Sequence, residues 1–337
     1  MKAAGFREPK TLADFDYQAI KNGFTVLYRS IFIAAHALAL DVAVVTHNER
    51  VFGRVPAHGK LAEGLIHSRP CSLLRQEVNM AKATRESQRS EAQELMWQAM
   101  EVIEKNEVRA AALCREALRV YPDCVDALAM LAQMESPTLK DYVAALRRAI
   151  EAGRRDLGAE YFEAEKGCFW GLIETRPFMR ALADLVFALL DWGTPERIDE
   201  AIKLQEEMLD LNPNDNQGMR DVLAACYLRQ KRYEDAARLL KRYKGDWAAV
   251  PCWSRVLVAL AAGAEEKAAR LLKDAREQNR HVEQYLTGQK RRPRSRPEMY
   301  SPGDQSEAVF CADTLWEAWK AHPKAKQWLK EKNAASA

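Results

Sequence analysis

The sequence lacks an excess of charge of one sign, closely spaced cysteines, and any hydrophobic run suited to crossing a membrane. Its 51 Lys and Arg residues nearly balance 48 Asp and Glu residues, so no global field favours nucleic acid or a membrane as partner. The seven cysteines show no CxxC spacing, and we expect small hydrophobes in a reducing, cytoplasmic setting. The longest apolar run, residues 24–45, contains Arg29, His36 and Asp41, which argues against a membrane span or a signal peptide.

Recognisable catalytic spacings are also absent. Neither a nucleophile with its base nor a set of paired carboxylates can be picked out from the sequence. Four histidines lie about ten residues apart, which differs from the i, i+3 or i+4 spacing of a metal-binding helix: His36, His47, His58 and His67. We therefore expect a chain that is not an enzyme and that uses no metal or cofactor.

A spaced set of small residues, Ala110, Ala201, Ala236 and Ala268, is the main positive signal. The last two intervals are 35 and 32 residues, close to the roughly 34-residue period of a tetratricopeptide repeat. In such a repeat a small residue lies where two antiparallel helices cross, because a larger side chain would hold their backbones apart. The pattern predicts an all-α, tetratricopeptide-like α-solenoid of about five helix pairs over residues 90–285.

Helix boundaries follow from prolines, caps and apolar periodicity. Pro122 and Pro137 break helical runs, and Asp215 is suited to cap the helix that follows it. Residues 178–192 are apolar nearly all round, which predicts a central, buried helix. The five predicted pairs cover residues 91–121, 124–134 with 139–153, 178–192 with 197–211, 216–230 with 233–243, and 251–262 with 265–278.

Residues 286–337 form a module of different character. Prolines within residues 288–302 forbid a continuous helix there. Helix resumes over residues 304–320, and residues 325–330 form a last turn. One face of the longer helix is apolar, so we expect it to cap the open end of the solenoid; that face carries Ala308, Cys311, Leu315 and Trp319.

Residues 91–330 contain several ungapped motifs: Phe169-Trp170-Gly171-Leu172, Glu174 to Arg180, Asn212 to Gly218, Tyr285-Leu286-x-Gly288-x-Lys290, Gly303-Asp304 with Glu307-Ala308, Ala318-Trp319, and Trp328-Leu329. Together these motifs resemble the suppression-of-tumorigenicity group of tetratricopeptide proteins and their bacterial relatives. The resemblance implies the solenoid fold and no established chemistry.

Residues 1–60 are predicted to be a separate, irregular α/β remnant, joined to the repeats by a linker at 61–89. Residues 33–40, 42–45 and 46–56 resemble the helix, strand and short helix that end a PIN-domain toxin ribonuclease. That family holds Mg²⁺ or Mn²⁺ with carboxylates. Here Thr46 and Asn48 match its polar motif, but Ser30 stands where the family has Asp, so residues 30–56 read as a fragment without its metal site.

Four arginines are candidates for holding a carboxylate or phosphate of a partner segment: Arg176, Arg180, Arg220 and Arg229. Arg176 and Arg180 are one helical turn apart, and the other two lie on the first helix of the next pair, which lines the concave face of such solenoids. The guanidinium fork binds anions bidentately. The alternative is that Arg176 pairs locally with Glu174 or caps backbone carbonyls.

The main functional hypothesis is a cytoplasmic, bacterial-type protein-interaction scaffold that binds a partner segment in the concave groove. One alternative is a metal-dependent ribonuclease completed in trans by another chain. Another is an RNA-binding adaptor that uses a basic loop, although a run of charge is more often a solvated loop and this one lacks interleaved aromatics. Its candidate contacts are Lys290, Arg291, Arg292, Arg294 and Arg296.

Overall fold

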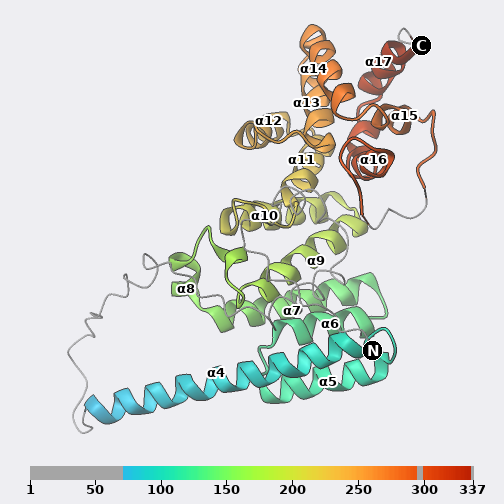
Figure 1. Ribbon diagram of the computed structural model, residues 1–337. Coiled ribbons are helices and arrows are strands. Elements are labelled where there is room, and N and C mark those ends of the chain that lie inside the picture. The colour runs from blue at the N-terminus through green and yellow to red at the C-terminus, as the bar shows by residue number, and fades with distance from the viewer. Residues whose placement is uncertain (1–70, 294–298, 335–337) are drawn as a thin grey trace, which may run out of the picture. The chain divides into compact units, whose positions relative to one another are not determined.

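The computed structural model describes residues 71–293 and 299–334, with side chains from residue 84 onward (Figure 1). These residues form helices and no strands, which confirms the all-α, repeat-like fold. They fall into two compact units that divide after Met134. The predicted remnant at residues 1–60 lies outside the described residues.

The described part of the first unit comprises three helices. Helix α4 (Cys71–Val102) starts inside the segment expected to be a linker, so residues 71–89 continue the first helix. Helices α5 (Glu107–Val120) and α6 (Val125–Glu135) follow, and the Asn106 side chain caps α5 by accepting a hydrogen bond from the Arg109 amide at 2.9 Å. Small residues let α4 and α5 approach closely; the buried core includes Ala92, Met96, Ala99, Ala110, Cys114 and Ala117.

The second unit contains the other helices and one 3₁₀ turn. Helices α9 and α10, α11 and α12, and α13 and α14 pack as the third, fourth and fifth predicted pairs, with ends within three residues of those expected. The elements are α7 (Leu139–Leu157), α8 (Ala159–Ala164), η2 (Phe169–Gly171), α9 (Arg176–Trp192), α10 (Pro195–Leu211), α11 (Met219–Arg229), α12 (Tyr233–Arg242), α13 (Ala249–Ala261), α14 (Glu265–Gln278), α15 (Val282–Thr287), α16 (Gln305–Lys320) and α17 (Pro323–Ala334).

Small residues occupy the crossings of these pairs. Ala201, Ala236 and Ala268 have no exposed surface, as the repeat pattern predicts. Helix α9 packs against both α7 and α10, and the prediction that it is central and buried is confirmed. Its buried residues include Phe178, Leu182, Leu185, Val186 and Leu189.

Ion pairs connect α7 with α10 at two successive levels. Arg147 donates from Nη2 to both carboxylate oxygens of Glu200, at 2.7 and 2.8 Å. Seven residues further along each helix, Arg154 donates in the same way to Glu207. Because all four side chains are partly exposed, the pairs fix the register of the two helices more than they add to stability.

The short elements α8 and η2 were not predicted, and they shape the start of α9. Phe162, Phe169 and Phe178 form an aromatic cluster with ring centroids 5.0 to 6.3 Å apart. The buried hydroxyl of Thr175 donates to the carbonyls of Phe169 and Leu172, and so holds the turn against α9. This places Trp170 and Arg176 side by side.

Candidate partner-binding face

Helices α9, α11 and α13 are the first helices of their pairs, which line the inner face in solenoids of this kind, and we call their surface the inner face. Helix α16 packs along both α11 and α13 on this face (Figure 1). Residues 222–228 of α11 and 249–254 of α13 are therefore buried all round. The helix predicted to cap the end of the repeats therefore lies on these two first helices.

Glu307 fastens α16 in this position. Its side chain is 2% exposed and accepts hydrogen bonds from the amides of Ala249 at 3.0 Å and Gly303 at 2.7 Å. The side-chain amides of Gln278 and Asn279 donate to it as well, at 3.0 Å. One carboxylate thus joins the first residue of α13, the end of α14 and the loop before α16, and its negative charge is favourable at the N-terminus of α13.

Arg220 lies at the start of α11 between two aspartates. Its Nη2 is 2.6 Å from Asp246 Oδ2, and its Nε is 3.8 Å from Asp215 Oδ2. The carboxylate of Asp215 also accepts hydrogen bonds from the backbone amides of Met219, at 2.7 Å, and Arg220, at 3.0 Å, which confirms that it caps α11. The guanidinium predicted to bind a partner is therefore engaged within the chain.

Several carboxylates surround Arg220, and because this single positive charge cannot neutralise them all, they repel one another. Burial, with Asp246, Asp215 and Glu307 nearby, raises the pKa of Asp221 to about 8, although Arg220 opposes the shift. Burial likewise raises the pKa of Asp215 to about 6. The start of α11 and the facing part of α16 therefore form an acidic layer that holds a proton near neutral pH.

Arg229 lies at the other end of α11, nine residues from Arg220 and hence on the opposite side of the helix. Its guanidinium donates to the Gly193 carbonyl at 3.3 Å and so caps the C-terminus of α9. It also lines a surface hollow of about 370 Å³ together with Ile198, Glu317 and Lys320. Arg220 and Arg229 therefore belong to separate sites.

Arg176 and Arg180 are brought together, as predicted. Arg176 donates from Nε to the Trp170 carbonyl at 3.0 Å, which is the local capping alternative, and its guanidinium carbon is 5.7 Å from the Trp170 ring centre. Burial and then the charge of Arg180 lower the pKa of Arg176 below its ordinary value. Arg180 is half-buried on α9, on a helical stripe that also carries the half-buried side chains of Asp184 and Phe187.

The basic loop is partly tied to the helices beside it. Lys290 donates to the Gln305 side chain at 2.8 Å, and Arg292 forms an ion pair with Asp313 of α16. Arg291 is exposed. Arg294 and Arg296 lie outside the described residues. The fold brings the half-buried Trp316 to Arg292, a contact that the position of Trp316 next to Leu315 in the sequence did not predict.

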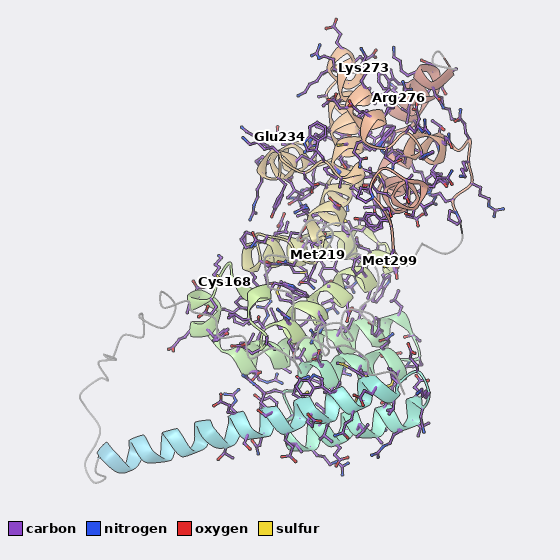
Figure 2. The ribbon with its side chains drawn as sticks, in the orientation of Figure 1. Cys168, Met219, Glu234, Lys273, Arg276 and Met299 are labelled. Carbon is purple, nitrogen blue, oxygen red and sulfur yellow. The ribbon has the colours of Figure 1, made fainter. Side chains whose placement is uncertain are left out.

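Within the described ranges, no helix is long and apolar enough to cross a membrane. The same residues hold no group of His, Cys, Asp and Glu side chains arranged to bind a metal. All six cysteines whose side chains are described are free thiols, and all but Cys168 are buried, as small hydrophobes would be (Figure 2).

The packed helix pairs define an α-helical repeat protein. Comparison with family models gives a match to the tetratricopeptide repeat over residues 195–246, which spans α10, α11 and α12. No curated protein matches the chain. The chain thus contains a tetratricopeptide repeat, and the repeat suggests interaction with other proteins.

Proposed function

We propose that this chain is a protein-interaction scaffold and that its partner segment lies along the half-buried stripe of α9 that carries Arg180, Asp184 and Phe187, outside the two helices on which α16 packs. The observation that carries the proposal is the packing of α16 on α11 and α13, because it gives an internal example of a helix seated on this face. The partner would occupy the next position on the same face.

Charge supports an acidic partner segment. Arg176 and Arg180 carry like charges one helical turn apart, and guanidinium forks bind carboxylates bidentately. Phe187 adds half-buried apolar area two turns along the same stripe. Arg220 and Arg229, which were also predicted to contact a partner, would act indirectly by holding α11 and the end of α9 in place.

The test compares affinity capture by tagged full-length protein, Arg180→Glu and the matched control Arg238→Glu, which reverses an exposed arginine on α12. We expect one discrete protein, recovered after nuclease treatment by wild type and control, with at least about tenfold weaker binding to Arg180→Glu. Equal binding by all three proteins, or no protein above background, would overturn the assignment to α9.

We also propose that this scaffold is a member of the suppression-of-tumorigenicity group of tetratricopeptide proteins, whose motifs its sequence resembles. The ribonuclease alternative depends on Thr46 and Asn48, which lie outside the described residues, and no observation on the described helices favours it.

A further inference from the structure

The basic loop and the C-terminal helix α17 meet at Trp316 of α16. The guanidinium carbon of Arg292 is 4.1 Å from the centre of the Trp316 ring, and Nζ of Lys326 is 4.7 Å from it. These cations come from segments 34 residues apart and share one half-buried indole. The sequence alone places no aromatic residue within the basic run, and the fold supplies one.

Positive charge at this indole exceeds what the neighbouring acids neutralise. Burial, then Lys330 and then Arg292, lower the pKa of Lys326 below its ordinary value. Asp313 pairs with Arg292. Glu317 lies 3.5 Å from Lys320, and Glu331 accepts a hydrogen bond from the neutral Gln327. The three cations Arg292, Lys326 and Lys330 therefore outnumber the carboxylates of Asp313 and Glu331. Lys330 is exposed one turn along α17 from Lys326.

We propose that Arg292, Trp316, Lys326 and Lys330 form a surface that binds single-stranded nucleic acid. Cations that track the phosphates beside an aromatic ring are the pattern by which proteins hold single strands without reading sequence. An acidic protein segment would use only the charges, whereas a base could also stack on the Arg292 guanidinium that lies over the indole. This surface is separate from the α9 face, so its failure would leave the proposed scaffold function untouched.

The experiment measures binding of full-length protein to labelled single-stranded RNA and single-stranded DNA by fluorescence anisotropy at several salt concentrations. The double variant Lys326→Gln/Lys330→Gln is expected to weaken binding about tenfold at about 50 mM salt and to flatten the salt dependence. The matched control Lys267→Gln/Lys273→Gln, on two exposed lysines of α14 (Figure 2), is expected to change it less than about twofold.

Trp316→Leu tests the aromatic contribution. We expect weaker binding with an unchanged salt dependence, because stacking involves no counterion release. Absence of binding at low salt, or equal losses in the α14 control, would overturn the proposal. Displacement of the oligonucleotide by polyglutamate at equal charge concentration would also overturn it, because the surface would then fit an acidic protein.

Discussion

The hydroxyl of Tyr233 lies 2.8 Å from Nε2 of His322 and joins the first residue of α12 to the turn before α17. Nδ1 of the same imidazole lies 2.7 Å from the Ala318 carbonyl, which can only accept, so Nδ1 carries the proton. In the neutral ring Nε2 is then the acceptor and the Tyr233 hydroxyl the donor. The repeats and the C-terminal module are therefore held together by a polar contact as well as by the apolar face of α16.

Tyr233→Phe removes this donor and leaves Nε2 without its partner. Because the contact is partly buried, we expect the free energy of unfolding to fall by about 1 kcal/mol. Urea denaturation of full-length protein would measure the loss. Tyr161→Phe is the control, since its hydroxyl bonds Glu174 in an exposed position; an equal effect of the two substitutions would contradict the structural role given to Tyr233.

Glu307→Gln should loosen α16. The amide has one acceptor oxygen where the carboxylate had two. Its NH₂ group would face either the amide of Ala249, which bonds Oε1, or the donors of Gly303 and Asn279, which bond Oε2. We expect a loss of about 3 kcal/mol in unfolding free energy, the scale for buried donors deprived of a charged acceptor. The control is Glu317→Gln on the exposed side of the same helix. If the melting temperature and the urea midpoint fell equally in Glu307→Gln and Glu317→Gln, Glu307 would not be the residue that holds α16 in place.

Stability should fall as pH rises through neutrality. The pKa of Asp221 is raised to about 8 in the folded protein, above the value of 3.8 that is ordinary for an aspartate in an unfolded chain. The folded state therefore binds more protons than the unfolded state between pH about 4 and about 8, and its free energy of unfolding decreases across that window. Asp215, raised to about 6, acts in the same direction.

The measurement is the melting temperature from pH 5 to pH 9 for wild type and Asp221→Asn. The variant cannot ionise, so we expect a flatter profile and a higher melting temperature than wild type at about pH 8. Asp246, Glu307 and Asp215 face Asp221 with the same charge and Arg220 with the opposite one. Parallel profiles for the two proteins would show that Asp221 does not hold the proton.

Local sequence patterns predicted where the helices lie, but they did not predict which helices pack against each other. Apolar spacing on α16 correctly marked Ala308, Cys311, Leu315 and Trp319 as buried. It could not show that they pack on α11 and α13, because an apolar stripe identifies a buried face and not the surface that covers it. Long-range polar contacts were equally hidden: Arg220 meets Asp246 across 26 residues.

Segments with weak periodicity account for the remaining differences. The short α8 and η2 offer no repeated pattern, and their position depends on the packing of Phe162 and Phe169. The start of α4 is polar, so it resembled a linker, although its sequence is compatible with helix. Arg176 and Arg180 are one helical turn apart in the sequence, and they lie close together in the structure as expected. Arg220 and Arg229 lie on the same helix but on opposite sides of it, so they do not meet.

Gln205→Met should stabilise the protein. Gln205 on α10 has no exposed surface, and among the described residues neither its Oε1 nor its Nε2 has a hydrogen-bond partner. A buried amide without partners loses its hydrogen bonds to water and makes none within the protein, which costs free energy. Methionine has a similar unbranched shape and has no amide group to desolvate. We expect the free energy of unfolding to rise by about 1 kcal/mol in urea denaturation. Gln327→Met, exposed on α17, should leave it unchanged. If Gln205→Met were destabilising instead, buried water would have to be bonded to the amide, and α10 would carry an internal polar site.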